Sequence, residues 1–217
     1  RDSRQLPPVG ASTRVLLAHP WVNDTARALE RRGARVLDAL FPLGAEGTTE
    51  WLRAAATEWG VDPEHFERVV APARARALAA VDHYRSELDG RRLFLFPDSQ
   101  IELPVARFLS RELGMKLVEV GMPHLDATYH AAELALIPDD VTVSEGQDVD
   151  LQLDRCRAAA PDLTVCGLGL ANPLEAEGLR TKWAIELVFS PVQGYDQAGD
   201  LAELFHRPLN RMKRLEV

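Results

Sequence analysis

Acidic side chains follow two predicted strands of this sequence and are the first candidates for chemistry. Asp98 follows one strand, and Glu145 and Asp148 follow another. Ligands of open α/β sheets bind beyond the carboxyl ends of the strands, so these groups could share one cleft, where mutual repulsion would raise a carboxyl pKa and permit acid catalysis. Helix capping by Ser99 and Asp148 is the simpler interpretation, because Ser and Asp are preferred caps.

Thiols and imidazoles are too sparse to predict a metal centre. The two cysteines, Cys156 and Cys166, are too few for a disulfide framework or a cluster held by cysteines alone, and we expect structural thiols. His124 and His130 fit neither a helical i, i+4 pair nor a zinc knuckle, so we expect polar surface or pocket residues. The sequence also lacks a Gly-x-Ser-x-Gly elbow, a Walker loop and a Cys-x-x-Cys pair.

A glycine pair after another predicted strand partly matches a phosphate-binding loop. Gly167 and Gly169 have the right spacing, but the third glycine of the pattern is replaced by Asn172. We therefore expect a strand whose glycines allow close approach of a neighbour or a flat ligand, followed by Asn172 as the cap of a helix beginning at Pro173. Trp183 and Phe189 flank the last predicted strand and either line an apolar pocket or pack in the core; burial habits favour the core.

Alternating strands and helices must position these residues. An N-terminal β-α-β unit is followed by helices, in which Thr48-Thr49 is a candidate cap and Asp89-Gly90 ends a long amphipathic helix. The predicted strands are 13–18, 35–41, 92–96, 116–120, 141–143, 163–169 and 184–189. The predicted helices are 26–32, one that begins at 48–49, 63–88, 102–113, 149–159, 175–181 and 196–209. This alternation predicts a doubly wound parallel sheet.

The composition excludes several classes of protein. Hydrophobic residues make up 46% and charged residues 27% of the 217 residues, as in globular proteins. The net charge of −8, with Lys and Arg scattered among acids, argues against nucleic-acid binding. The longest apolar runs are far shorter than a membrane span of ~20 residues, so we expect no membrane span and a cytoplasmic location.

The N-terminus predicts a longer polypeptide. The sequence begins at Arg1 without Met, and residues 1–10 read as a loop that contains Pro7 and Pro8. We expect further residues upstream. We expect three parts within the sequence: 1–45 as part of an α/β domain, 46–90 as a helical linking segment, and 91–217 as a Rossmann-like α/β domain.

Longer stretches resemble the N subunits of light-independent protochlorophyllide reductases, which are nitrogenase-like proteins. The stretches are 41–51 (FPLGAEGTTEW), 96–109 (FPDSQIELPVARFL), 144–156 (SEGQDVDLQLDRC) and 161–195 (PDLTVCGLGLANPLEAEGLRTKWAIELVFSPVQGY). The resemblance runs in order from about Pro7 to near the end. It departs from the family at 122–130, where an aromatic residue is expected in place of His124.

The resemblance implies a fold and a reaction. The fold is the α/β class with Rossmann-like doubly wound parallel sheets of the nitrogenase component 1 type. The reaction is reduction of the D-ring double bond of protochlorophyllide to chlorophyllide, in the cytoplasm or the plastid stroma. Implied partners are the B subunit, in a heterotetramer of two N–B pairs, and the iron-sulfur L protein that hydrolyses ATP. The family's [4Fe-4S] cluster takes three cysteines from the N-terminal domain of the N subunit, and this sequence has no matching positions. The resemblance therefore implies that the cluster ligands lie outside this chain and that the chain alone is inactive.

One wall of the tetrapyrrole cavity is the role expected for this chain. A flat, largely apolar ligand calls for aliphatic and aromatic side chains with few polar ones. From their places near the last strand ends, the candidate substrate-binding or subunit-contact residues are Asn172, Leu174, Trp183, Gln193 and Tyr195. Two alternatives stay open: a non-catalytic tetrapyrrole-binding or assembly module of the same fold, and, by analogy of fold, a free-standing nucleotide enzyme, against which the missing glycine counts.

Overall fold

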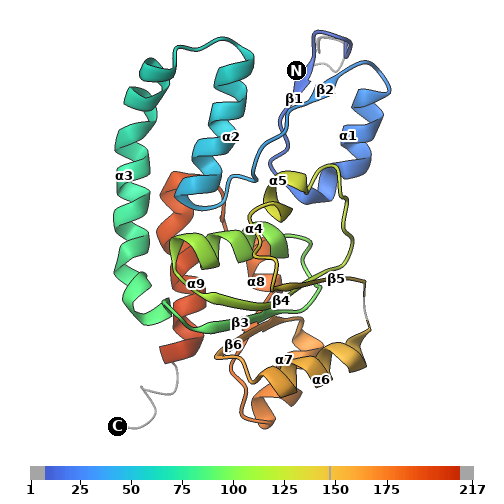
Figure 1. Ribbon diagram of the computed structural model, residues 1–217, viewed down its shortest axis with the longest axis vertical. Helices are drawn as coiled ribbons and strands as arrows, with labels where there is room; N and C mark the ends of the chain where they lie inside the picture. The colour runs from blue at the N-terminus through green and yellow to red at the C-terminus, as the bar shows by residue number, and fades with distance from the viewer. Residues whose placement is uncertain (1–7, 147, 211–217) are drawn as a thin grey trace.

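A computed structural model of the chain describes residues 8–146 and 148–210 (Figure 1). The expected N-terminal loop therefore lies mostly outside the described residues, as does Gln147 of the loop before the helix at 149–159. Figure 1 shows three parts: an N-terminal unit, a helical hairpin beside it, and a sheet with helices above and below. None of the helices among the described residues is long and apolar enough to cross a membrane.

The N-terminal unit is a small parallel β-α-β piece. Strands β1 (Arg14–Val15) and β2 (Arg35–Val36) pair in parallel on either side of α1 (Asn23–Glu30), which follows a 3-10 turn at Pro20–Val22. The connectivity matches the prediction, but the strands are shorter than 13–18 and 35–41. Within the described residues these two strands pair only with each other, so there is no third strand to extend the ladder.

A hairpin of two helices, α2 (Gly44–Glu58) and α3 (Pro63–Leu88), follows. The start of α3 is as predicted, with Pro63 in the first turn and the Asp62 carboxylate accepting from the backbone N–H of His65 at 2.8 Å. The prediction that Thr48-Thr49 caps α2 is wrong. Both threonines lie inside α2, and its first N–H groups donate instead to the distant carboxylate of Glu112.

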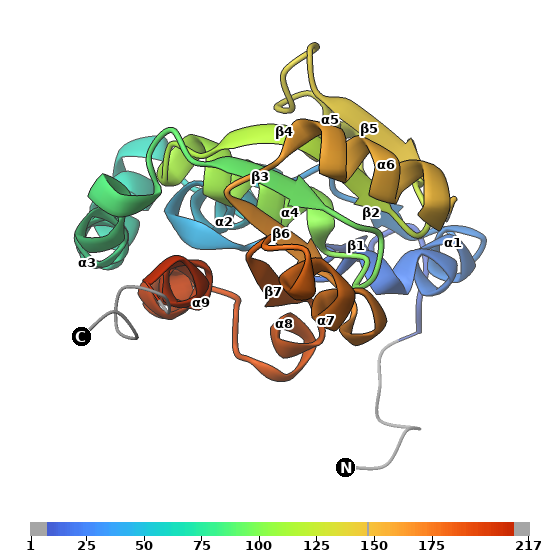
Figure 2. The same cartoon turned by 90° about the horizontal axis from the view of Figure 1, so that it is seen from below.

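The sheet has five parallel strands in the order β5-β4-β3-β6-β7. The strands are β3 (Arg92–Leu95), β4 (Lys116–Met122), β5 (Thr142–Glu145), β6 (Leu163–Cys166) and β7 (Thr181–Trp183). This order confirms the predicted doubly wound sheet, and Figure 2 shows its central strands side by side. The chain leaves β3 toward β4 and β5 and returns on the other side of β3 at β6, so the topological switch point lies between β3 and β6.

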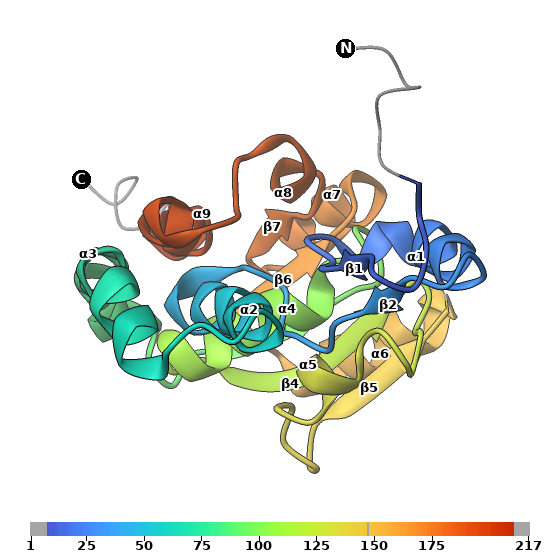
Figure 3. The same ribbon diagram turned by 90° about the horizontal axis from the view of Figure 1, so that it is seen from above.

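Helices cover both faces of this sheet. In Figure 1, α4 (Glu102–Arg107), which continues as a π-helical turn (Phe108–Glu112), lies above the sheet, and α6 (Val149–Ala159) and α7 (Leu168–Ala176) lie below. The short α5 (Ala131–Leu134) follows β4. The last described elements are α8 (Ile185–Phe189), a 3-10 turn (Tyr195–Gln197) and α9 (Ala198–Asn210), which packs against α3 (Figure 3).

The prediction for the segment after β6 is wrong. The expected strand at 184–189 is helix α8, and the expected helix at 175–181 begins earlier, at Leu168. The strand at this edge of the sheet is β7, where Thr181 pairs with Thr164. A short apolar run does not distinguish strand from helix by periodicity, and pairing with β6 decides which residues extend the sheet.

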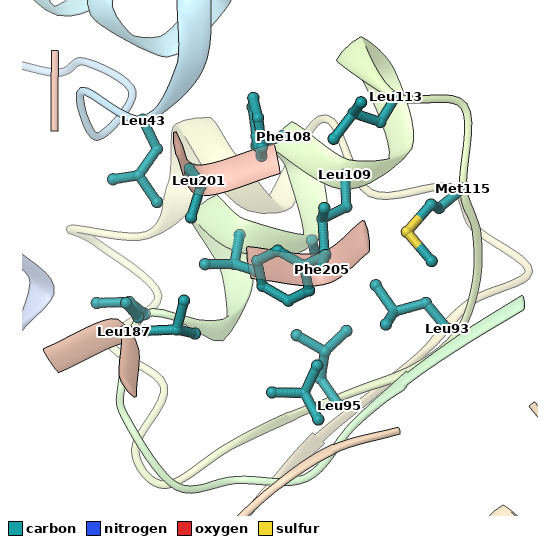
Figure 4. Close-up of a cluster of buried hydrophobic side chains, with 14 of the residues drawn as sticks. Leu43, Leu93, Leu95, Phe108, Leu109, Leu113, Met115, Leu187, Leu201 and Phe205 are labelled. Atoms are coloured by element: carbon teal, nitrogen blue, oxygen red, sulfur yellow. The ribbon is translucent and has the colours of Figure 1, made fainter. Parts of the chain in front are cut away.

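Alternating side chains of β3 separate two hydrophobic cores. Leu93 and Leu95 point into the main core with α4 and α9, as Figure 4 shows, whereas Phe94 and Phe96 join a second core against α6 and α7. The main core runs from Phe41 to Phe205 and includes residues of all three expected parts. The division at 45 and 90 stays a prediction.

A buried ion cluster of Arg107, Glu112 and Glu133 joins these parts. The fully buried Arg107 donates from Nε to Glu133 at 2.8 Å and from Nη2 to the carbonyls of Phe41 and Leu43 at 3.1 and 3.0 Å. Its Nη1 lies 3.6 Å from the Glu112 carboxylate. Burial raises the pKa of the Glu112 carboxyl to about 7 and that of Glu133 above its usual range. The cluster therefore holds the segment that enters α2 against α4.

Candidate functional site at the carboxyl ends of the strands

The β3–α4 loop occupies the switch point and is held by a buried carboxyl group. Glu102 accepts from the backbone N–H of Asp98 at 2.9 Å, from the N–H of Ser99, and from the Ser99 hydroxyl at 3.0 Å. The prediction that Ser99 caps the helix is wrong, because α4 begins after Ile101 and Ser99 donates to Glu102 instead. Burial raises the pKa of Glu102. Glu102 therefore fixes the loop that presents Asp98.

Asp98 lies across the switch point from β6. A Cβ built on Gly167 would come within 2.7 Å of its Oδ1, so Gly167 permits the close approach of the two loops. Partial burial raises the pKa of Asp98 above its usual range, although the residue is exposed overall. Asp98 is thus an ionisable group poised between β3 and β6.

The other two carboxylates have different partners. Asp148 caps α6 by accepting from the N–H of Leu151 at 3.2 Å, as the simpler interpretation predicts. Glu145 accepts from the N–H of Leu125 at 2.9 Å and lies 3.3 Å from Nδ1 of His124. No hydrogen bond or ion pair among the described residues joins these carboxylates to Asp98, so the structure does not support a shared acidic cleft.

Large apolar side chains are exposed at the ends of β6, β7 and α8. Trp183 ends β7 with 41% of its surface exposed, and Phe189 ends α8 with 81% exposed. The prediction that both pack in the core is wrong, since Ala184 and Leu187 take the buried positions of this segment. We use the name apolar edge for the exposed large apolar residues that follow β6 and β7 in the chain, which are Leu168, Trp183, Val188 and Phe189.

Two of the predicted site residues lie on α7. Asn172 is exposed within this helix and is not its cap, because α7 begins after Gly167, one and a half turns earlier than predicted. Leu174 is fully buried in the second core beside Phe96. The helix thus presents Asn172 to solvent and anchors itself to the sheet through Leu174.

Two other predicted site residues, Gln193 and Tyr195, connect the loop after α8 to the N-terminal third of the chain. The Gln193 amide donates to the carbonyl of Ala18 and lies 3.3 Å from Nδ1 of His19. The Tyr195 hydroxyl is 2.8 Å from the hydroxyl of Thr49 in α2. Of the five predicted residues, Trp183 belongs to the apolar edge, and Gln193 and Tyr195 brace the loop that follows it. Their contact with a ligand stays a prediction.

Trp21 also lies at this end of the sheet, and the sequence analysis missed it. Its Nε1 donates to the carbonyl of Ser99 at 2.7 Å, its ring stacks on His19 with centroids 4.4 Å apart, and 45% of its surface is exposed. The same rule of inspecting strand ends, applied to the first short strand, would have found it.

Comparison with known protein families gives a match over most of the chain. The family model described as "Nitrogenase component 1 type Oxidoreductase" matches residues 2–210. This chain is a member of the nitrogenase component 1 type oxidoreductase family. A solved nitrogenase chain, "Nitrogenase Cp1 at pH 5", superposes with a TM-score of 0.70 at 13% identity over 90% of this chain and 46% of that chain. That likeness confirms the fold class.

Curated relatives in this nitrogenase-like family are far more similar in sequence. "Light-independent protochlorophyllide reductase subunit N" of Rhodopseudomonas palustris (strain BisB18) is 67% identical over 99% of this chain and 50% of its own length. The protein of the same name from Bradyrhizobium sp. (strain BTAi1 / ATCC BAA-1182) is 64% identical over all of this chain and 51% of its own. These matches confirm the resemblance found in the sequence. The chain spans about half the length of these relatives.

The family implies metal–sulfur clusters, but the thiols of this chain do not fit one. Cys156 and Cys166 are both buried, and Sγ of Cys156 lies 3.6 Å from the Thr164 hydroxyl. Burial raises the pKa of Cys166 to about 12, whereas cluster ligation needs thiolates. Among residues 8–146 and 148–210, no group of three or more His, Cys, Asp or Glu side chains is placed to hold a metal ion.

The two histidines considered as ligands differ in environment. His124 is exposed, beside Glu145. His130 was expected at the surface or in a pocket, but it is fully buried and its Nδ1 accepts from the N–H of Asp126 at 3.0 Å. Burial lowers the pKa of His130 and favours the neutral ring. His130 therefore closes the turn before α5.

Proposed function

We propose that this chain is part of the N subunit of an ATP-dependent light-independent protochlorophyllide reductase. In this reaction the D-ring double bond of protochlorophyllide is reduced to give chlorophyllide. The proposal is supported by 67% identity to a relative of that name over 99% of the chain. The single structural observation that carries it is the exposure of Trp183, which ends strand β7, and of Phe189, which ends the helix that follows.

The apolar edge has the chemistry that a tetrapyrrole wall needs. Water-exposed aromatic and aliphatic surface gains about 25 cal/mol per Å² when a ligand covers it, and the flat face of a macrocycle covers several such side chains at once. Large exposed apolar side chains grouped at a ligand-binding end of a sheet commonly mark an interaction site. We assign the contact to Trp183 and Phe189. Gln193 and Tyr195 position the loop that follows, Leu174 anchors α7, and Asn172 is a polar contact at its surface.

The remaining components of the enzyme belong to the same proposal. The relatives are named as subunit N, which implies further subunits. We propose a B subunit in a heterotetramer of two N–B pairs, an iron-sulfur L protein that hydrolyses ATP, and a [4Fe-4S] cluster whose ligands lie outside this chain. We also propose a cytoplasmic location, or the plastid stroma if the enzyme is encoded in a plastid. On this proposal the chain alone has no reductase activity.

The test uses the full-length N subunit that contains this sequence, purified anaerobically with its B subunit. Protochlorophyllide turnover is measured by the absorption of chlorophyllide with the L protein, reductant and ATP. We expect Trp183→Ala and Phe189→Ala each to lower kcat/KM at least about tenfold, because each removes an apolar contact of roughly 1.4 kcal/mol or more.

A matched control is Trp59→Ala, which truncates an exposed tryptophan at the end of α2, in the helical hairpin. We expect it to retain normal turnover. If both edge variants turn over substrate like the Trp59 control, the apolar edge does not contact the pigment. If the unaltered complex binds pigment without reducing it, the chain belongs to a non-catalytic tetrapyrrole-binding module instead.

A further inference from the structure

Trp21 has a feature that Trp183 and Phe189 lack in the described contacts: its ring plane is fixed from two directions. The indole N–H donates to the Ser99 carbonyl at 2.7 Å, and the imidazole of His19 lies nearly parallel to the ring, with 7° between the planes. His19 is in turn 3.3 Å from the Gln193 amide. An exposed tryptophan held this way loses little further freedom when a ligand binds it.

Trp21 is not a member of the apolar edge, but its contacts connect it to the loops at the same end of the sheet. Ser99 belongs to the β3–α4 loop at the switch point, and Gln193 lies four residues beyond Phe189. Trp21 therefore reaches the ligand-binding end of the sheet from the N-terminal unit, whereas Trp183 and Phe189 reach it from the last strand and α8. Figure 3 shows the N-terminal unit and α8 as separate elements around the sheet.

We propose that Trp21 is a second aromatic contact for the tetrapyrrole, against which the flat macrocycle stacks. This inference rests on the proposed function and adds a residue to its binding site. A general apolar contact would not need a fixed ring plane, but offset stacking of two conjugated ring systems depends on their mutual orientation. Burial lowers the pKa of His19, so the stacked imidazole is neutral near pH 7 and adds no charge beside an apolar ligand.

The kinetic expectation follows from where stacking acts. The face of the macrocycle changes little when one ring bond is reduced, so stacking stabilises the bound substrate and the transition state nearly equally. Loss of such uniform binding raises KM and leaves kcat almost unchanged. An aromatic stacking contact corresponds to about a fivefold change in affinity.

The experiment compares Trp21→Leu, Trp21→Phe and Trp59→Leu in the full-length N subunit with its B subunit. The dissociation constant of protochlorophyllide is taken from its absorption change, and KM and kcat from turnover. We expect Trp21→Leu to raise the dissociation constant and KM about fivefold with kcat within about twofold of the unaltered enzyme. Trp21→Phe keeps a stacking ring and loses the indole N–H, so its KM should stay close to that of the unaltered enzyme.

Three outcomes overturn the inference. If Trp21→Leu behaves like Trp59→Leu, Trp21 does not contact the pigment. If Trp21→Phe raises KM as much as Trp21→Leu does, the hydrogen bond to Ser99 matters and stacking does not. A fall in kcat without a rise in KM means that Trp21 supports the fold or the chemistry. The proposed function fails separately, if the unaltered complex binds protochlorophyllide without reducing it.

Discussion

The apolar edge and the buried ion cluster reverse the usual distribution of side chains. Trp183 and Phe189 are apolar and exposed, while Arg107 and Glu133 are charged and fully buried. Buried charges are costly unless paired, and Arg107 meets carboxylates and two backbone carbonyls. Exposed aromatics cost the fold little. The buried charges of this chain therefore fix the position of the backbone around Phe41 and Leu43, whereas its exposed apolar side chains are available for binding.

The two regions are connected through the backbone. Arg107 donates to the carbonyls of Phe41 and Leu43, and the intervening Pro42 carbonyl accepts from the N–H of Gly194 at 2.8 Å. Leu43 also forms an isolated bridge with Gln193. The ion cluster therefore holds the segment against which the loop after α8 is hydrogen-bonded.

The largest expected change in the free energy of unfolding comes from removing the cation of the buried ion cluster. Arg107→Met leaves Glu112 and Glu133 buried without their cation and should lower the free energy of unfolding by about 3 to 5 kcal/mol. The matched control is Arg111→Met, whose guanidinium pairs with Glu46 at the surface and should cost less than about 1 kcal/mol. Denaturant unfolding of both variants makes the comparison. Equal losses would show that burial of the cluster does not matter.

A smaller change in the free energy of unfolding is expected from the titration of Glu112. Its pKa is about 7 in the folded chain and near 4.5 when unfolded, because burial disfavours the carboxylate. The folded state then binds more protons between these values, so the stability that Glu112 contributes is present below pH 4.5 and is lost as the pH rises through 7. The loss is at most about 3 kcal/mol.

Unfolding of the unaltered chain and of Glu112→Gln between pH 4.5 and 8 measures this contribution. Glutamine does not ionise, so we expect the stability of the unaltered chain relative to the variant to fall across this range. A difference that stays constant with pH would mean that Glu112 titrates normally in the folded protein.

The smallest effect on stability is expected at the apolar edge itself. Phe189→Ala removes an exposed ring and should change the free energy of unfolding by less than about 0.5 kcal/mol. Leu187→Ala, two residues earlier in the same helix, empties a buried position and should cost about 2 to 5 kcal/mol. Thermal or denaturant unfolding of the two variants measures both costs. A cost at Phe189 as large as at Leu187 would place its ring in the core and remove it from the binding surface.

The elements with strong local signals were predictable from the sequence. The periodic pattern that begins at Pro63 correctly located α3, and Asp148 correctly located the start of α6, because its capping bond joins residues three positions apart. The alternation of strands and helices predicted the parallel sheet, and its topology indicated the strand ends as the place to look for a site. Trp183 was a candidate on that ground.

Other features depend on residues distant in sequence. The start of α2 is capped by Glu112 and not by its own threonines, and Trp21 is oriented by Ser99.

By itself the sequence determined the family, the α/β alternation and the long helices, because these rest on residue identity and on contacts within a few positions. The packed structure was needed to show that 185–189 is a helix, that Arg107 is buried, and that Trp183 and Phe189 are exposed. Exposure and pairing depend on which surfaces the packed elements leave open, and no short window of sequence contains that information.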